Sequence, residues 1–204
     1  CRYLIDHKIM KDTATLLLKK HWGYGSLRET QQRAIESIMS GRDTMVIMPT
    51  GGGKSLCYQL PALMCEGIVI VVSPLIALME DQVKTLNRRG IKARYINSTL
   101  SREKISQYLN EAIEGKLRLL YITPERIHTE SFSSAAEWLN VAFIAIDEAH
   151  CISMWGHDFR PSYREVATMR EYFPQAPMMA LTATATPSVV NDIASSLGFE
   201  GRYE

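Results

Sequence analysis

The amino-acid sequence predicts one α/β domain, a three-layer sandwich in which a mostly parallel sheet has helices on both faces. Apolar, β-branched runs at residues 68–72 and 141–146 alternate with segments of helical periodicity, and this alternation is typical of a parallel sheet covered on both sides. A glycine-rich segment at residues 48–55 also lies between an apolar run and a helix-like segment. Strand, glycine-rich loop and helix in this order predict a phosphate-binding loop.

Composition fits a folded domain of ordinary size. The 204 residues are 46% hydrophobic and 22% charged, and a net charge of +1 excludes a polycation. The cysteines Cys1, Cys57, Cys65 and Cys151 contain no C-x-x-C pair, which favours buried thiols over a zinc site or a disulfide framework. No apolar run reaches membrane-spanning length, so we expect no membrane partner and an intracellular location. Because the chain begins with Cys1 rather than Met, we expect a fragment or a processed chain.

The predicted elements follow one another without an internal repeat. Helices are expected at residues 9–20 and 29–39, with a loop at residues 21–25 and Gly41 closing the second helix. A buried strand at residues 45–48 leads into the phosphate loop, and the helix at residues 55–60 ends at Pro61. The other predicted strands span residues 68–72, 93–96, 117–122, 141–146 and 178–182. The other predicted helices span residues 74–89, 101–114 and 187–197, and Pro161 opens one more after a loop that runs to Phe159.

The phosphate loop is predicted from Met-Pro-Thr-Gly-Gly-Gly-Lys-Ser at residues 48–55. Its glycines let successive N–H groups point at one centre, where the N-terminus of the following helix adds a positive field. Lys54 is expected to bind the β- and γ-phosphates of ATP, and the Ser55 hydroxyl to ligate Mg²⁺. The other predicted nucleotide contacts are Thr50, Gly51, Gly52 and Gly53. The alternative is a flexible turn with an incidental lysine, since Met48 stands where the strict pattern has glycine.

An Asp-Glu-Ala-His segment directly follows the apolar run at residues 141–146. Ligands bind at the carboxyl ends of the strands in open α/β sheets, so we expect Asp147 to hold Mg²⁺, partly through water, and Glu148 to position or deprotonate the attacking water. A solvated helix N-terminus is the alternative. His150 is expected to act as a relay in contact with Thr182 and Thr184, or else to be a satisfied core histidine.

These motifs, in this order, closely resemble the RecQ family of superfamily 2 DNA helicases. The resemblance rests on residues 48–59, on Asp-Glu-Ala-His-Cys-Ile-Ser at residues 147–153 and on Trp-Gly-His-Asp-Phe-Arg-Pro at residues 155–161. It extends from about Trp22 to Leu197, and Met48 is usual in that family. The resemblance implies a P-loop NTPase fold of the RecA-like type. Residues 1–204 would then be the helicase ATP-binding domain, the first RecA-like lobe, with residues 1–21 as a helical lead-in.

The resemblance also implies an adenine-recognition element at the start of the domain. Tyr24 would stack on the base, Gln31 would hydrogen-bond its edge, and Arg28 would lie nearby. Leu27 stands where the family usually has Phe, which is a conservative difference. A plain half-buried aromatic is the alternative for Tyr24.

Two segments that follow strands are similar to the family's motifs that contact the nucleic-acid backbone. They are Ser73 with Pro74, and Thr123 with Arg126. Because both follow strands of one parallel sheet, their hydroxyls and N–H groups are expected to meet phosphates at the same edge. Helix capping is the alternative, and it is compatible with such contacts.

Residues 155–160 resemble the aromatic-rich loop that couples DNA binding to ATP hydrolysis in the family. Trp155 and Phe159 offer ring faces to unpaired bases, while His157 and Arg160 are suited to phosphate. A buried aromatic cluster is the alternative, but the polar residues and glycine between the rings favour an exposed loop. Met154 stands where many members carry Gln.

The resemblance therefore implies an ATP- and Mg²⁺-dependent DNA helicase that moves 3′ to 5′ and acts in DNA repair and recombination, with residues 182–184 linking hydrolysis to movement. Single-stranded DNA, duplex junctions and a second RecA-like lobe are the expected partners. The second lobe, the zinc-binding region and the winged-helix region are expected to be absent from this chain. Because the arginine finger comes from the second lobe, the isolated fragment is expected to be nearly inactive. The expected location is the nucleus in a eukaryote, or the cytoplasm or nucleoid in a prokaryote.

Two other functions remain open from the sequence. The first is one lobe of a DEAH-type RNA helicase, which shares the Asp-Glu-Ala-His tetrad but lacks the loop at residues 155–160 as it stands here. The second is a nucleotide-gated DNA-binding module without turnover. Lys54, Asp147 and Glu148 are all intact, which argues against the second alternative.

Overall fold

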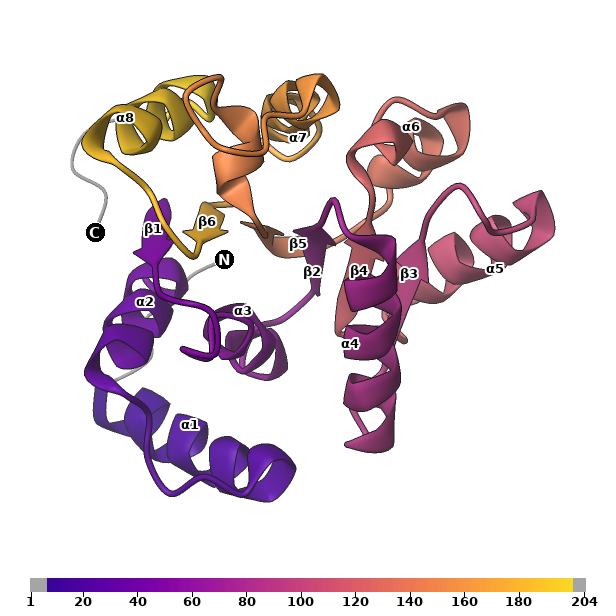
Figure 1. Ribbon diagram of the computed structural model, residues 1–204. Coiled ribbons are helices and arrows are strands. Elements are labelled where there is room, and N and C mark those ends of the chain that lie inside the picture. The colour runs from indigo at the N-terminus through magenta and orange to yellow at the C-terminus, as the bar shows by residue number, and fades with distance from the viewer. Residues whose placement is uncertain (1–6, 200–204) are drawn as a thin grey trace.

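Six parallel strands form the centre of the computed structural model, which describes residues 7–199 (Figure 1). Their order in the sheet is β1-β6-β5-β2-β4-β3, and every neighbouring pair is parallel. The strands are β1 (Thr44–Ile47), β2 (Ile68–Val72), β3 (Ala93–Ile96), β4 (Leu119–Ile122), β5 (Val141–Ile146) and β6 (Met178–Thr182). All six predicted strands are therefore present, and the sheet is wholly parallel where a mostly parallel one was predicted.

The strand β2 shows why the apolar runs occupy the middle of the sheet. All five of its residues are buried, and it pairs with β4 on one side and β5 on the other. Side chains alternate along a strand: Ile68, Ile70 and Val72 belong to one apolar cluster, whereas Val69 and Val71 belong to the other. Because both faces are covered, both sets of side chains have to be apolar.

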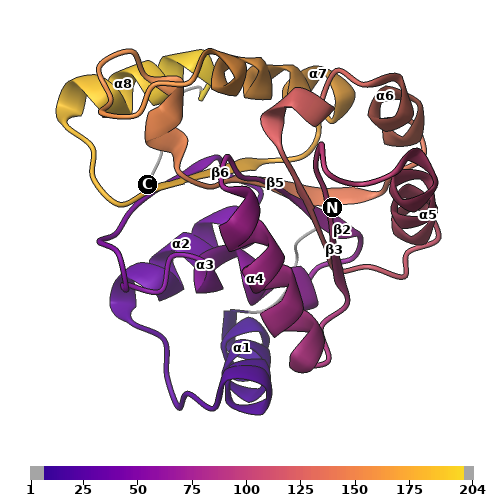
Figure 2. The same cartoon turned by 45° about the vertical axis from the view of Figure 1, so that its right-hand side comes forward.

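The helices form two layers on opposite faces of the sheet (Figure 2). One layer contains α1 (His7–Trp22), α2 (Glu29–Met39), α3 (Leu56–Gln59), the 3-10 helix η1 (Pro61–Leu63) and α4 (Ile76–Arg88). The opposite face carries α5 (Arg102–Ile113), η2 (Pro124–Arg126), α6 (Glu130–Ala136), η3 (Ala149–Ile152), η4 (Pro161–Thr168), α7 (Met169–Tyr172) and α8 (Pro187–Ser196). Since all strands run in one direction, the segments after β1, β2, β4, β5 and β6 meet at one edge of the sheet.

Several predicted boundaries were wrong. The first helix continues to Trp22, so His21 and Trp22 are helical and do not belong to a loop. The strand predicted at residues 45–48 spans Thr44–Ile47; it is buried as predicted except at Ile47, which is 45% exposed because β1 is an edge strand. The helix predicted at residues 55–60 has only four residues, because Pro61 begins a 3-10 turn directly after it. The strand predicted from residue 117 begins at Leu119.

The short helices on the other face were the main omission. The segment predicted as a loop from residue 147 to Phe159 contains η3 (Ala149–Ile152), and the helix opened by Pro161 is a 3-10 helix that changes to α-helix at Met169. Neither η2 nor α6 was predicted. Elements this short carry too little apolar periodicity to be recognised, since a helical pattern needs about 11 residues.

Other predictions concern thiols, membranes and the chain ends. Cys57, Cys65 and Cys151 are buried, as predicted. Cys1, the first part of the predicted lead-in (residues 1–6) and residues 200–204 lie outside the described residues. Among residues 7–199, none of the helices has both the length and the apolar character needed to cross a bilayer.

Candidate nucleotide-binding site

The phosphate loop turns back on itself between β1 and α3. Gly51 and Gly53 have φ angles of 79° and 83°, a left-handed conformation that side chains with a Cβ disfavour. The N–H of Gly52 donates to the carbonyl of Pro49 at 2.9 Å, and a Cβ on Gly52 would lie only 2.8 Å from that oxygen. The predicted glycines therefore have a clear conformational reason to be there.

Lys54 points its ammonium group back toward the start of the loop. Its Nζ donates to the carbonyl of Met48 at 3.2 Å, and the N–H of Met48 donates to the carbonyl of Thr182 at 3.0 Å. The lysine is thus held at the carboxyl ends of β1 and β6. A phosphate oxygen would be a stronger acceptor for this ammonium than a neutral carbonyl, because both partners would then be charged.

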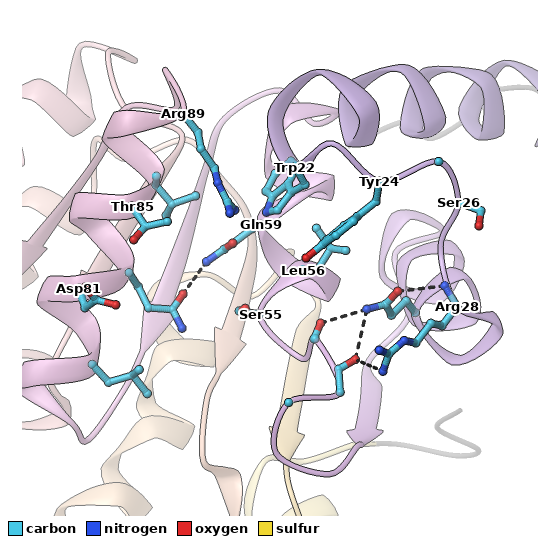
Figure 3. Close-up of a pocket in the computed structure, with 18 residues that line it drawn as sticks. Trp22, Tyr24, Ser26, Arg28, Ser55, Leu56, Gln59, Asp81, Thr85 and Arg89 are labelled. Carbon is cyan, nitrogen blue, oxygen red and sulfur yellow. Dashed lines mark hydrogen bonds between the residues drawn. The ribbon is translucent and has the colours of Figure 1, made fainter.

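Arg28 and Gln31, both part of the predicted adenine-recognition element, contact the phosphate loop, and Figure 3 shows Arg28 beside it. The Arg28 guanidinium donates to the carbonyl of Gly52 at 3.2 Å, and the Gln31 amide donates to the carbonyls of Gly52 and Gly53 at 3.3 Å. The Gln31 side-chain oxygen accepts the N–H of Arg28 at 2.9 Å. Gln31 is buried, with 5% of its surface exposed. These two side chains hold the Gly52 and Gly53 carbonyls in place.

A pocket of about 560 Å³ opens beside the loop. Tyr24, at 57% exposure, stands at its rim, so its ring is more exposed than the half-buried alternative allowed. The opposite wall comes from α4 and from Arg89 directly after it, whose guanidinium lies 5.6 Å from the centre of the Trp22 ring. The sequence did not single out Trp22 or Arg89. The other lining residues include Arg28, Gln31, Gly51, Gly52, Gly53, Ser55, Leu56, Gln59, Asp81 and Thr85.

Asp147 lies directly after β5 and is almost completely buried. The pKa of its carboxyl is raised to about 6, mainly by burial and also by the nearby charge of Glu148, while the Glu148 N–H and the Lys54 ammonium act in the opposite direction. The Glu148 N–H donates to Asp147 Oδ1 at 3.0 Å. A buried carboxylate beside a second carboxylate gains from a cation in the site.

Glu148 adopts a left-handed backbone conformation, with φ 50° and ψ 44°. It is the only residue other than glycine with positive φ among those described. Such a conformation costs about 1–3 kcal/mol and persists where the surroundings impose it, commonly at functional sites. The turn aims the Glu148 carboxylate toward His150, whose Nδ1 lies 3.3 Å from Glu148 Oε2. No local sequence pattern signals this conformation.

His150 is in the predicted contact with the segment after β6. Its Nδ1 lies 3.1 Å from the hydroxyl of Thr182, and that hydroxyl donates to the carbonyl of Thr184 at 3.1 Å. Burial lowers the pKa of His150, although the Glu148 carboxylate acts in the opposite direction. His150 bridges the Glu148 segment and the residues after β6.

The aromatic loop at residues 155–160 is exposed at Trp155, His157 and Asp158, as predicted, and partly buried at Phe159 and Arg160. Trp155 and Met154 are 76% and 58% exposed, which excludes a buried aromatic cluster at Trp155. The His157 ring stacks on the His150 ring, with centroids 4.4 Å apart and 14° between the planes. Arg160 pairs with Asp158 at 3.0 Å and donates to the carbonyl of Pro74 at 3.3 Å. Phe159 lies under the guanidinium of Arg164.

The two segments predicted to meet the nucleic-acid backbone lie after the neighbouring strands β2 and β4. The Ser73 and Thr123 side chains are each 2% exposed. Ser73 Oγ has no hydrogen-bond partner within residues 7–199, and Thr123 donates to Glu125. Thr123 is the N-cap residue of η2, but neither hydroxyl makes a capping hydrogen bond. Arg126 is half-buried on η2.

The residues at the phosphate loop fit Mg²⁺ and a nucleoside triphosphate. The Ser55 hydroxyl and the Asp147 carboxylate supply the hard oxygen ligands that Mg²⁺ prefers, and the Lys54 ammonium supplies a positive charge for phosphate oxygens. Lys54 is near enough to Asp147 to lower the pKa of its carboxyl. The carboxylate, the hydroxyl and the ammonium would therefore act on the same bound group.

A second set of potential ligands does not make a convincing metal site. Atoms of His150, Cys151 and Asp158 lie within 4.8 Å of one another. Burial raises the pKa of the Cys151 thiol to about 12, so it is not a thiolate at neutral pH. The Asp158 carboxylate is already paired with Arg160. We assign no metal to this group.

Comparison with known proteins places these features in a family. The sequence profile described as DEAD/DEAH box helicase matches residues 28–193. The chain is 47% identical over 201 residues to the ATP-dependent DNA helicase RecQ of Haemophilus influenzae, and 52% identical over 190 residues to that of Bacillus subtilis. These alignments cover 98% and 92% of this chain but 32% of each relative. The chain thus spans about a third of the length of the curated relatives it matches.

Solved structures share the fold. The crystal structure of the DUF1998 helicase MrfA bound to DNA and AMPPNP matches all of this chain and 29% of its own, with a TM-score of 0.73 and 21% identity. A hypothetical ATP-dependent RNA helicase from Sulfolobus tokodaii matches 96% of this chain and 56% of its own, with a TM-score of 0.69 and 16% identity. At these identities the likeness concerns the fold alone.

Proposed function

The chain belongs to the DEAD/DEAH box helicase family, and we propose that it is the ATP-binding lobe of a RecQ-type DNA helicase. In this proposal the whole protein couples Mg–ATP hydrolysis to 3′-to-5′ movement along DNA, in repair or recombination. A second RecA-like lobe, outside this chain, completes the enzyme. The high identity to proteins named ATP-dependent DNA helicase RecQ supports the choice of DNA.

One observation carries the proposal: an exposed aromatic loop contacts the segment that holds the candidate catalytic carboxylates. The His157 ring stacks on the buried His150, and His150 in turn contacts Glu148 and Thr182. Trp155, nearby in the same loop, is 76% exposed. A ring that stacks on unpaired bases therefore lies in a loop connected to the hydrolytic site.

The roles of the phosphate-loop residues follow from their positions. Lys54 exchanges its bond to the Met48 carbonyl for phosphate oxygens, and the glycine-rich turn supplies backbone N–H donors. Ser55 and Asp147 hold Mg²⁺, Asp147 partly through water. Bound Mg²⁺ neutralises the charge that develops on the phosphates.

The residues after β5 position the attacking water, and those after β6 link hydrolysis to movement along DNA. Glu148 orients or deprotonates the attacking water, and His150 keeps Glu148 aligned through its Nδ1. A displacement of the His150 ring is passed on to Thr182, whose hydroxyl contacts the ring, and from there to Thr184.

Tyr24 stacks on the adenine at the rim of the pocket. Because a cation from the opposite lobe is needed for the transition state, this lobe alone is expected to bind nucleotide weakly and to turn over little.

The test is unwinding by the full-length protein on matched substrates. With ATP and Mg²⁺ it should separate a DNA duplex carrying a 3′ single-stranded tail, and it should separate the same duplex with a 5′ tail, or an RNA duplex, far more slowly. Preferential unwinding of RNA would overturn the proposal in favour of an RNA helicase. Nucleotide-dependent DNA binding without phosphate release would overturn it in favour of a binding module.

A further inference from the structure

The buried hydroxyl of Tyr163 joins the ends of two central strands. Tyr163 lies on η4 (Pro161–Thr168), just after the aromatic loop, and is 0% exposed. Its hydroxyl donates to the carbonyl of Asp147 and lies 3.2 Å from the carbonyl of Val72. Carbonyl oxygens only accept, so the single hydroxyl proton is shared between these two acceptors.

The two carbonyls belong to the two segments that the proposed function has to couple. Val72 ends β2 and leads directly into Ser73 and Pro74, the candidate contacts to the nucleic-acid backbone. Asp147 follows β5 and carries the candidate Mg²⁺ carboxylate. The N–H of Asp147 also donates to the Val72 carbonyl at 2.9 Å. Tyr163 is therefore the third member of a small buried network at the edge where the strands end.

The same segment is tied to the aromatic loop. The N–H of Tyr163 donates to the carbonyl of Arg160 at 2.8 Å, and the N–H of Arg160 donates to the carbonyl of Cys151 at 3.0 Å. The Arg160 guanidinium reaches the carbonyl of Pro74 at 3.3 Å. A displacement of the loop at Arg160 would therefore displace Tyr163, whose hydroxyl is hydrogen-bonded to the Asp147 carbonyl.

We propose that Tyr163 is a positioning residue that transmits movement of the DNA-facing aromatic loop to the Asp147 carboxylate. The inference rests on the proposed function, because it concerns how DNA binding speeds hydrolysis. Tyr163 touches neither nucleotide nor DNA in this account. It acts through the backbone of Asp147, much as an outer-shell partner orients a metal ligand.

The test is Tyr163→Phe in the full-length protein, with Tyr172→Phe as the matched control. The substitution removes only the hydroxyl. Tyr172 lies on α7, is half-buried and packs edge-on against Phe132. We expect Tyr163→Phe to lower the DNA-stimulated kcat by about tenfold or more, on the scale of lost outer-shell contacts. The KM for ATP and the affinity for single-stranded DNA should change little, the DNA-independent rate should fall much less than the stimulated rate, and Tyr172→Phe should match the wild type.

Two outcomes overturn the inference. One is Tyr163→Phe with stimulated and basal rates that both equal those of the wild type. The other is an equal fall in both rates, which together with a lower melting temperature is what a purely structural residue would give. A wild-type protein whose ATP hydrolysis does not respond to DNA would instead overturn the proposed function.

Hydrogen exchange on the unmodified protein gives a second test that does not depend on the folding of a variant. Single-stranded DNA alone, without nucleotide, should change exchange at residues 147–153 and 160–166 together and leave β3 unchanged. A change confined to residues 153–159 would contradict transmission through Tyr163.

Discussion

The phosphate loop and the aromatic loop both lie against the Asp147–His150 segment, yet they are held in opposite ways. The polar groups of the phosphate loop are engaged internally: Lys54 bonds to Met48, and the Gly52 carbonyl receives donors from Arg28 and Gln31. The aromatic loop is secured at its ends and exposes Trp155 to solvent. Changes in the phosphate loop should therefore alter nucleotide chemistry and stability, whereas changes at Trp155 should alter only the response to DNA.

The largest effect is expected from Lys54→Ala in the full-length protein. The substitution removes a charge-assisted contact to the phosphates, so ATP hydrolysis should fall by about 100-fold or more, as for other lost transition-state donors. Lys116→Ala is the control, because Lys116 is an exposed lysine paired with Glu114 and should leave hydrolysis unchanged. Near-normal steady-state hydrolysis by Lys54→Ala would contradict the assignment of the phosphate loop.

Gln31→Ala should have an intermediate effect, which should appear as a lower free energy of unfolding of the nucleotide-free protein. Because Gln31 is buried and its amide holds two loop carbonyls, its loss should lower the free energy of unfolding by about 1–3 kcal/mol. Gln32→Ala is the matched control, since Gln32 is half-buried and its amide donates to Glu36 in the same helix. Denaturant unfolding of both variants measures the difference. Equal stability of Gln31→Ala and the wild type would mean that Gln31 does not hold the loop.

A further effect on stability concerns pH and Asp147. Burial raises the pKa of its carboxyl from 3.8 to about 6, so the folded protein binds this proton more tightly than the unfolded chain. The stabilisation by the bound proton is complete below the unfolded pKa and is lost as the pH rises through about 6. Without Mg²⁺, Asp147→Asn should therefore be more stable than the wild type at pH 8, by on the order of 3 kcal/mol. The advantage should shrink toward pH 5.

Thermal melts of the two proteins across this pH range provide the measurement. The Glu148 N–H bond to Asp147 Oδ1 can be kept by Asn, so the comparison isolates the charge. A stability difference that is the same at pH 5 and pH 8 would contradict the raised pKa.

The sequence was sufficient to predict the layers of the fold, because each depends on local patterns. The run at residues 68–72 is apolar throughout and forms the central strand β2, and the helix predicted at residues 29–39 has the bounds of α2. The phosphate loop was predicted because its chemistry lies within eight consecutive residues. Short pieces such as η3 and α6 were missed, since a few residues cannot show helical periodicity.

The part of the site that the sequence did not reveal depends on contacts between distant residues. Gln31 holds Gly52 across 21 positions, and Arg160 reaches Pro74 across 86. The left-handed backbone of Glu148 is imposed by its surroundings, because glutamate has no intrinsic preference for it. Tyr163 is one buried aromatic among several, and only the three-dimensional structure places its hydroxyl at the ends of β2 and β5.

The decisive measurement compares Trp155→Ala with Trp138→Ala in the full-length protein. Both tryptophans are exposed, at 76% and 71%, but Trp138 follows α6 and lies outside the aromatic loop. Stacking contributes about 1–3 kcal/mol per base, so Trp155→Ala should lose most of the stimulation of ATP hydrolysis by single-stranded DNA. Its nucleotide affinity and melting temperature should stay at wild-type values, and Trp138→Ala should behave like the wild type throughout. Full stimulation in Trp155→Ala, or an equal loss in Trp138→Ala, would contradict the account.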